Sequence, residues 1–337
     1  MKLLSIDGGG IKGLYSAIVL DYIENYYDIK IIDHVDVISG TSIGGIIAIA
    51  LAAGNSPRSI INFLLNYGPL IFPSKGIGGF ARLTKSLFFS KYNSTILKKA
   101  CIDFFSEDAC LNDLFNKEYP DRRRSMKLSI CIPSVNISTG KVKVFKTPHS
   151  DELFLDKGYK LWQVALATSA APYYLPIAKI SKENIDEKYI DGGLWGNNPS
   201  LVAFTEALTY SNKSESPIPD ESMDLLSIGN IPENLGITRN ILNRGLLLWN
   251  IKLVLLPLSC QAESIHNMIK LLFTKNQWNY IRIEHANSNI PGVKLDSSKR
   301  KNMDLIQQLA LSDISNYVSA NTAGDKKIRQ FFNLEGK

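Results

Sequence analysis

The stretch from Val35 to Gly54 constrains the fold most strongly. An apolar run, VDVIS, breaks into the turn GTSIGG and resumes as the apolar run IIAIALAAG. This order predicts a buried strand, a tight turn and an apolar helix. Gly40, Ser42 and Gly44 match the pattern G-x-S-x-G, in which a strained serine leaves no room for side chains two positions away. The turn is either simple punctuation or the site of a serine nucleophile.

The first 27 residues repeat this strand, turn and helix order. KLLSI (2–6) is apolar, DGGGIKG (7–13) cannot hold regular structure, and LYSAIVLDYIENYY (14–27) has helical spacing of its apolar residues. A β-α-β crossover leaves its two strands parallel, with their carboxyl ends at one edge of the sheet. The two glycine-rich turns are therefore expected to be neighbours.

The glycine run of the first turn suits the binding of an oxyanion. The backbone N–H groups of Gly8, Gly9 and Gly10 have no side chains to cover them, and Lys12 adds a positive charge nearby. Such donors stabilise the negative oxygen that develops during acyl transfer. Together with Ser42, this turn favours a hydrolase.

The same turn also fits a second class of protein. Gly8, Gly10 and Gly13 match G-x-G-x-x-G, and Asp33 follows about twenty residues later, as in a dinucleotide-binding unit of an oxidoreductase. Locally this alternative stays open. A dinucleotide fold, however, has no use for a second glycine turn carrying a serine on the neighbouring strand.

The general base is the least obvious part of the predicted site. The chain has four histidines, none beside a glycine-rich or acidic turn: His34, His149, His266 and His285. In KYIDGGLWGNNP (188–199), by contrast, Asp191 ends a short strand and is followed by Gly192 and Gly193. An exposed aspartate has a pKa near 3.9, so a basic role at neutral pH requires partial desolvation.

Composition sets the class of molecule. The 337 residues, 45% of them hydrophobic, predict one α/β domain over 1–337, with the motifs inside 1–230 and a basic, mainly helical part at 231–337. All of the net charge of +6 lies in that last part, which holds 14 basic and 8 acidic residues and could attract an anionic partner. The four cysteines are widely spaced, and the amino-terminal apolar run is too short for a secretory leader, so we expect reduced thiols and a cytoplasmic protein.

Further elements follow from periodicity. Strands are expected at 127–135, 141–147 and 225–230, and helices at 42–67, 160–169, 199–212, 238–273 and 302–320. The apolar stretch 245–258 is expected to be a core helix, since it is too short to span a bilayer. Segment 69–92 mixes aromatic and basic residues, which suits either a cap lying on an anionic membrane or ordinary packing over the core.

Four motifs in this chain order resemble the patatin-like phospholipases. They are DGGGIKG (7–13), GTSIGG (40–45), ATSAAPYYLP (167–176) and DGGLWGNNP (191–199), and they cover about residues 1–230. The resemblance implies a three-layer α/β/α fold with a mostly parallel sheet. Lys12 stands where arginine is commoner in the family, and Asn230 where a threonine-glycine pair is usual.

The resemblance also implies a mechanism. Ser42 would be the nucleophile and Asp191 the base of a dyad without histidine, with amides of Gly8, Gly9 and Gly10 as oxyanion donors. The implied activity is phospholipid hydrolysis at a membrane surface, with no metal or organic cofactor and no nucleic-acid partner. Some similar short bacterial proteins act in phage defence under the control of a cyclic dinucleotide, and a catalytically inactive lipid-binding or partner-binding module is a further alternative.

Overall fold

The computed structural model describes residues 1–74, 89–119, 127–150, 152–183, 185–211, 222–236, 249, 251–288 and 290–334. The strands are β1 Lys2–Ile6, β2 Val37–Gly40, β3 Ser129–Asn136, β4 Lys141–Lys146, β5 Ala178–Lys182, β6 Ile185–Asp191, β7 Asp224–Ile228 and β8 Tyr280–Ile283. The helices are α1 Gly13–Tyr27, α2 Ile43–Ala52, α3 Pro57–Ile71, α5 Thr95–Phe105, α6 Leu111–Asn116, α7 Leu161–Ser169, α8 Gly193–Gly196, α9 Ser200–Ser211, α11 Lys252–Lys275, α12 Arg300–Tyr317 and α13 Ala323–Phe332. Two short 3-10 helices are η1 Gly10–Lys12 and η2 Ile31–Asp33.

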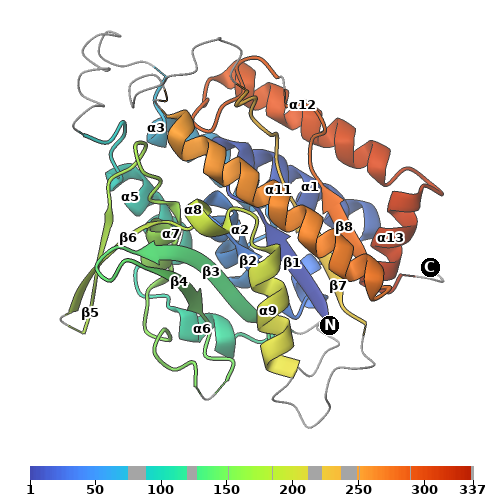
Figure 1. Ribbon diagram of the computed structural model, residues 1–337, viewed down its shortest axis with the longest axis horizontal. Helices are drawn as coiled ribbons and strands as arrows, with labels where there is room; N and C mark the ends of the chain where they lie inside the picture. Colours follow the sequence, from blue (N-terminus) through green and yellow to red (C-terminus); the bar gives the residue numbers. More distant parts are fainter. Residues whose placement is uncertain are drawn as a thin grey trace.

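The strands form one mixed sheet in the order β5-β6-β3-β2-β1-β7-β8 (Figure 1). The central strands β3, β2, β1, β7 and β8 are parallel, whereas β4, β5 and β6 pair antiparallel. In-register pairing of β1 with β2 brings the two glycine-rich turns to the same edge of the sheet, as the crossover rule predicts.

Two hydrophobic cores show that helices cover both faces of the sheet. Leu3 of β1 belongs to the core under α9 and α11, while the next residue, Leu4, belongs to the larger core under α1, α2 and α7. Successive side chains of a strand point to opposite faces, so this alternation places the sheet between two helical layers. The predicted three-layer α/β/α fold is confirmed.

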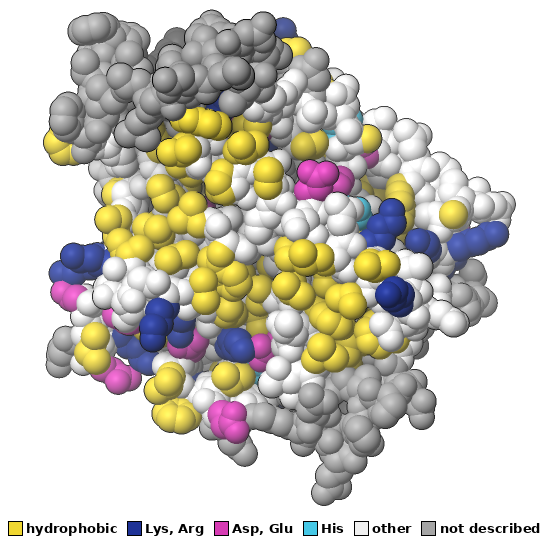
Figure 2. All heavy atoms as spheres, viewed as in Figure 1, with side chains coloured by type: hydrophobic (Ala, Val, Ile, Leu, Met, Phe, Trp, Pro, Cys, Tyr) yellow, Lys and Arg dark blue, Asp and Glu magenta, His cyan; other side chains and the backbone are white. Residues whose placement is uncertain are grey.

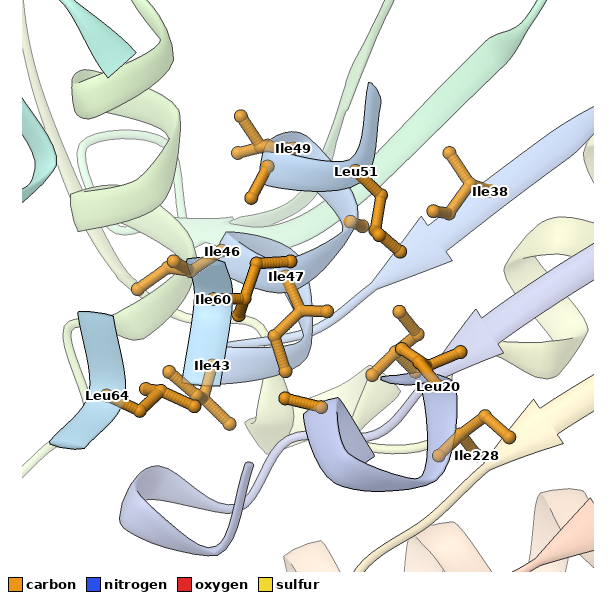
Figure 3. Packing of buried hydrophobic residues seen from close by; sticks show 14 of the residues in the cluster. Leu20, Ile38, Ile43, Ile46, Ile47, Ile49, Leu51, Ile60, Leu64 and Ile228 are labelled. Carbon is orange, nitrogen blue, oxygen red and sulfur yellow. The ribbon is translucent and has the colours of Figure 1, made fainter. Parts of the chain in front are cut away.

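The helix after Ser42 is buried on all sides. Every residue of α2 is buried, and Figure 3 shows its isoleucines against Ile38 of β2, Leu20 of α1 and Ile60 of α3. Full burial of such a helix fixes its amino terminus firmly, because repositioning it would disturb packing in every direction. The helical pattern expected over 42–67 is present, but it is divided between two helices, α2 and α3. Gly54, at a φ of 87°, ends the first helix, and Pro57 begins the second.

The expected core helix at 245–258 is wrong for its described part. Residues 251–258 are partly or fully exposed, and Leu253 is 48% exposed. This part of α11 lies on the surface of the second helical layer (Figure 1), where only one of its faces can be covered. Residues 245–248 and 250 lie outside the described residues.

Other predicted elements agree with the structure or are added to by it. The predicted strands at 127–135, 141–147 and 225–230 appear as β3, β4 and β7. The structure also contains β5, β8, α5, α6 and α13, which lie outside the predicted elements. Most of the predicted cap at 69–92, residues 75–88, lies outside the described residues. In the described parts of the chain, no helix is long and apolar enough to cross a bilayer.

Candidate active site

Ser42 sits at a sharp turn between β2 and α2. Its backbone has a φ of 56°, a left-handed value that is strained for a residue with a side chain. A Cβ at Gly40 would lie 2.1 Å from the carbonyl oxygen of Gly44, and a Cβ at Gly44 would lie 2.2 Å from that of Ile6. The steric reason for glycine on both sides of the serine is confirmed.

Asp191 reaches this turn because β2 and β6 pair with the same edge of β3. β2 pairs with the start of β3, up to Ser39 opposite Cys131, and β6 then pairs antiparallel with its end, where Asp191 faces Ser134. Since β4 occupies the other edge of β3, both strands lie on the same edge. β6 therefore runs head-on toward the end of β2.

Ser42 and Asp191 are in direct contact. The Ser42 Oγ donates a hydrogen bond of 2.7 Å to Oδ2 of Asp191, and the backbone N–H of Gly193 donates one of 2.7 Å to Oδ1. Ser42 is 9% exposed and Asp191 is 4% exposed. The geometry matches a nucleophile and a base within hydrogen-bond reach, with the base held in turn by a third group.

Burial makes Asp191 a stronger base than an ordinary aspartate. Desolvation raises the pKa of its carboxyl to about 6, against the opposing effect of the hydrogen bonds from Ser42 and Gly193. A carboxylate with this pKa is ionised at neutral pH and can accept a proton more readily than one with a pKa near 4. The desolvation that the sequence required of this residue is present.

Thr168 fixes the backbone of the turn and was not singled out from the sequence. Its Oγ1 accepts the N–H of Ser42 at 2.9 Å and donates to the carbonyl oxygen of Pro133 at 2.6 Å. Its carbonyl oxygen also accepts the N–H of Gly192 at 3.2 Å. Thr168 thus ties the serine turn to the segment after Asp191. Its position inside ATSAAPYYLP was the only available signal.

The structure narrows the set of possible oxyanion donors. The N–H of Gly8 is already donated to the carbonyl oxygen of Asn197 at 3.0 Å, so the expectation that Gly8 is a donor is not met. The N–H groups of Gly9 and Gly10 have no hydrogen-bond acceptor among the described residues. Gly10 has a φ of 58°, and a Cβ there would lie 2.3 Å from the carbonyl oxygen of Leu295.

Lys12 lies close to the loop but its charge is engaged elsewhere. Its Nζ donates to the carbonyl oxygen of Ile231 at 2.9 Å and lies 3.3 Å from Oε1 of Glu233. An ammonium group neutralised in this way contributes little to an oxyanion. We therefore regard Lys12 as a buried anchor of the loop, which corrects its expected place in the oxyanion hole.

The histidines are engaged away from the dyad. Nε2 of His149 bonds Glu206, Nδ1 of His266 bonds the Tyr280 hydroxyl, and Nδ1 of His285 bonds Asp313. The ring of His34 packs edge-on against Phe332.

The dinucleotide alternative also lacks its acid. Asp33 ends η2, which precedes β2, so it lies near the amino end of that strand. A ribose-binding acid is needed at the carboxyl edge instead, where the glycine loop lies.

A narrow apolar cavity opens at Ser42. It has a volume of about 40 Å³ and is lined mainly by α2, α3 and the segment after α7, with Ile46, Leu64, Phe72 and Leu175 among its walls. Cavities that enclose whole small ligands usually measure about 300 to 1,000 Å³. Only the end of an apolar chain fits the cavity in this conformation.

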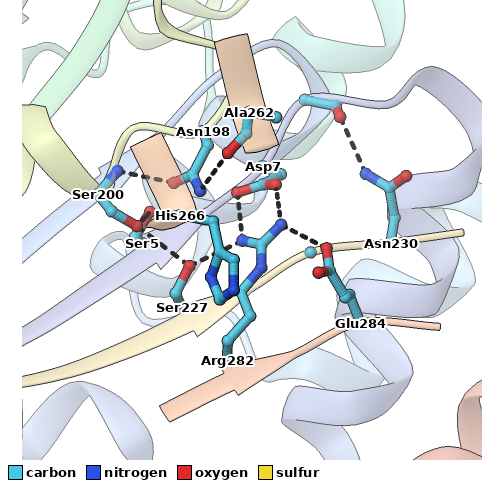
Figure 4. A network of polar contacts seen from close by, with 12 residues as sticks. Ser5, Asp7, Asn198, Ser200, Ser227, Asn230, Ala262, His266, Arg282 and Glu284 are labelled. Atoms are coloured by element: carbon cyan, nitrogen blue, oxygen red, sulfur yellow. Dashed lines mark hydrogen bonds and ion pairs between the residues drawn. The ribbon is translucent and has the colours of Figure 1, made fainter. Parts of the chain in front are cut away.

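A larger polar cavity lies on the other side of the glycine loop. It measures about 360 Å³, and its lining includes Gly8 and Gly9 from the loop and residues of α11 and β8. Arg282 crosses its floor and donates two hydrogen bonds to Asp7, of 2.9 and 2.6 Å, and one of 2.6 Å to Glu284 (Figure 4). Asp7 starts the glycine loop, so this ion pair ties the loop to β8.

Comparison with known proteins gives the family. Residues 4–204, well over half of the chain, match the family model described as patatin-like phospholipase. The chain belongs to the patatin-like phospholipase family. It is therefore a carboxylic ester hydrolase, and the oxidoreductase alternative does not hold.

Several relatives of this patatin-like chain are similar over most of their length. A cGAMP-activated phospholipase of Escherichia coli (strain TW11681) is 29% identical, with 98% of this chain and 92% of the relative aligned. A cGAMP-activated phospholipase of Vibrio cholerae serotype O1 is 31% identical over 86% of this chain and 82% of the relative. Patatin-like protein 3 of Arabidopsis thaliana is 28% identical over 90% and 78%.

Proposed function

We propose that this protein cleaves fatty-acyl esters of membrane phospholipids through a Ser42–Asp191 dyad and an acyl-enzyme. The observation that carries the proposal is the 2.7 Å hydrogen bond from Ser42 to the buried Asp191, on a strained turn beside a glycine loop. Family membership supports the reaction class. The substrate and the residue roles are the finer part of the proposal.

The reaction has two halves, acylation and deacylation, and in each half Asp191 accepts one proton and then donates it. Asp191 accepts the Ser42 proton as Oγ attacks the ester carbonyl, and the N–H groups of Gly9 and Gly10 hold the oxyanion. The carbon–oxygen bond then breaks, and the leaving lysophospholipid alkoxide takes the proton from Asp191. In the second half a water gives its proton to Asp191 and attacks the acyl-enzyme. The fatty acid leaves and Ser42 recovers its proton.

An apolar chain and a membrane surface suit the surroundings of the dyad. The cavity at Ser42 offers apolar walls to an acyl chain, and it must widen to hold more than the chain's end. Hydrophobic side chains also gather on the face crossed by α11 (Figure 2), and Met268 and Leu271 of this helix are more than half exposed. Exposed apolar side chains of this kind favour peripheral contact with a bilayer.

The test compares each dyad residue with a matched control. Hydrolysis of a p-nitrophenyl ester and of phospholipid vesicles is measured for Ser42→Ala and Asp191→Asn, and both are expected to lose about a thousandfold or more in kcat. Ser169→Ala, a serine lining the same cavity, and Asp186→Asn, an aspartate earlier in β6, are the controls and keep their activity.

Labelling by a fluorophosphonate separates the nucleophile from the rest of the site. The probe is expected to modify Ser42, identified by mass spectrometry of the peptide. Labelling of another serine, or near-normal hydrolysis by folded Ser42→Ala, contradicts the mechanism. An absence of labelling in the wild-type protein, both alone and with each cyclic dinucleotide, supports an inactive module instead.

We also propose that a cyclic dinucleotide activates the enzyme, because the bacterial relatives are named as cGAMP-activated phospholipases. The polar cavity is the candidate site, because its volume of about 360 Å³ falls in the range of small-ligand pockets and its wall includes the glycine loop. Three of its carboxylates are paired with cations: Asp7 and Glu284 with Arg282, and Glu233 with Lys12. A ligand that changes this wall can change the geometry of Gly9 directly.

Calorimetry and hydrolysis assays with a panel of cyclic dinucleotides test the activator. Ala262→Phe fills the cavity from α11 and is expected to abolish both binding and activation, whereas Ser264→Phe, exposed on the same helix, does not. Binding that survives Ala262→Phe places the ligand elsewhere. Failure of every cyclic dinucleotide to bind or activate removes the regulatory proposal but not the hydrolase.

A further inference from the structure

The carbonyl of Gly8 is held by a side chain from outside the four family motifs. Nδ2 of Asn230 donates a hydrogen bond of 2.9 Å to the Gly8 carbonyl oxygen (Figure 4). In a planar trans peptide, the carbonyl and the following N–H point in opposite directions. The N–H of Gly9 therefore points away from Asn230.

Ser42 and Asn230 lie against neighbouring residues of the glycine loop and line different cavities. A Cβ at Gly8 would lie 2.4 Å from Oδ1 of Asn197 and 3.3 Å from the Cβ of Ser42, whereas a Cβ at the next residue, Gly9, would lie 2.5 Å from Nδ2 of Asn230. Asn230 lines the polar cavity and Ser42 the apolar one. An N–H that points away from Asn230 is free to face the ester carbonyl that Ser42 would attack, because Asn230 and Ser42 line different cavities.

We infer that Asn230 is a positioning residue that aims the Gly9 N–H at the oxyanion. This inference rests on the proposed acyl transfer and adds to it the residue that orients one donor. Asn230 itself lines the polar cavity and not the cavity at Ser42, so it does not touch the reacting atoms. It acts only through the peptide between Gly8 and Gly9.

The rest of the loop explains why this one hydrogen bond matters. The Gly8 N–H is fixed by Asn197, and the Gly9 carbonyl oxygen accepts the Lys12 N–H at 3.2 Å. Between these two anchors, the peptide joining Gly8 to Gly9 has glycine on both sides and is free to rotate unless its carbonyl is held. Among the described residues, Asn230 is the group that holds it.

Asn230 is itself held firmly. It lies two residues after the end of β7, and its carbonyl oxygen accepts the N–H of His285 at 3.3 Å. The residue before it, Gly229, donates its N–H to the carbonyl oxygen of Ile283 in β8 at 2.8 Å. The amide that braces the loop therefore stands on two paired strands rather than on a free segment.

The experiment removes the donor while keeping the shape of the side chain. Asn230→Leu and Asn230→Asp both lose the N–H, and each is expected to lower kcat about tenfold to a hundredfold with KM nearly unchanged. Asn230→Thr, which restores a shorter donor, is expected to recover part of the rate. Asn316→Leu, at an exposed position of α12 that lines neither cavity, is the control and keeps its kcat.

A pair of inhibitors separates positioning from general damage. A trifluoromethyl ketone forms a tetrahedral oxyanion on the serine, whereas the corresponding secondary alcohol fills the same space without one. Asn230→Leu is expected to weaken the ketone by the same factor as kcat and to leave the alcohol unchanged. A merely structural role would weaken both inhibitors together.

Two results would overturn the inference. One is a folded Asn230→Leu or Asn230→Asp variant that keeps its kcat and its ketone affinity. The other is an equal loss of ketone and alcohol binding. Both leave the proposed function standing, because wild-type hydrolysis continues. Wild-type protein that hydrolyses no ester, either alone or with any cyclic dinucleotide of the panel, would overturn the proposed function and this inference together.

Discussion

The two sides of the glycine loop differ in size and chemistry. On the side of Ser42 the space is narrow, about 40 Å³, and its walls are apolar. On the side of Arg282 it is about 360 Å³ and its floor is a network of ion pairs and hydrogen bonds. One short segment, Gly8 to Gly10, separates the two.

The difference shows how a flexible glycine run can present amides with a fixed aim. Apolar walls beside Ser42 exclude water and strengthen the electrostatic contacts of the dyad. Polar groups on the far side, Asn230 and Arg282, hold the loop by its carbonyl and by Asp7. The reacting serine, Ser42, and the groups that hold the loop, Asn230 and Arg282, thus line different cavities beside the same loop.

The largest effect is expected at Gly44, where the start of α2 packs against the backbone that leads into the glycine loop. A Cβ in Gly44→Ala would lie 2.2 Å from the Ile6 carbonyl oxygen and 2.6 Å from that of Asp7. We expect a loss of about 5 kcal/mol in the free energy of unfolding and no hydrolysis, measured by denaturant titration and ester assay. Gly140→Ala, at a φ of 69° with nothing within 4 Å, should cost only about 1 kcal/mol. If both variants lost the same free energy of unfolding, the close contact of the Gly44→Ala methyl with Ile6 and Asp7 would not be the cause of the loss.

The polar side is tested next. Arg282→Met leaves the carboxylate of Asp7 buried without its partner, and we expect a loss of about 4 kcal/mol in unfolding free energy. Glu284→Gln removes the more exposed partner and should cost less than about 1 kcal/mol. The double variant Asp7→Asn, Arg282→Met should recover part of the loss. A single Arg282→Met variant as stable as wild type would contradict the anchoring role.

The apolar side should control acyl-chain length. Ala171→Leu narrows the cavity at Ser42, and we expect it to lower kcat/KM for a long-chain p-nitrophenyl ester by about tenfold to a hundredfold relative to the acetate ester. Ala262→Leu makes the same change in the polar cavity and should leave that ratio unchanged. If both variants shift the ratio equally, the two cavities do not have separate roles.

The smallest effect is the pH dependence. Because the pKa of Asp191 is raised to about 6, its carboxylate becomes protonated below that pH and can no longer accept the Ser42 proton. We expect kcat/KM to be half-maximal near pH 6 and to fall about tenfold per pH unit below it, measured on the folded protein between pH 4.5 and 8. A profile that is flat down to pH 4.5 would mean that Asp191 is solvated and is not the base.

Local motifs predicted the parts of the site that depend on local sterics. The sequence predicts the glycines around Ser42, because a strained turn leaves no room for side chains there. It also predicts the burial of Asp191, because an aspartate that acts as a base at neutral pH needs a raised pKa. The sequence does not predict the hydrogen bond from the Gly8 N–H to the Asn197 carbonyl oxygen. The two residues are far apart in the chain, and no spacing rule links them.

The sequence by itself determined the two strand-turn-helix units and their adjacency, since glycine conformation and the handedness of a crossover are fixed by backbone sterics. The tertiary structure alone decided that Asp191 meets Ser42, because β2 and β6 use one edge of β3 in succession and only that pairing brings their ends together. It also decided that Asn230 braces the loop, because β7 pairs with β1. Long-range strand pairing depends on the whole chain, so no local pattern carries it.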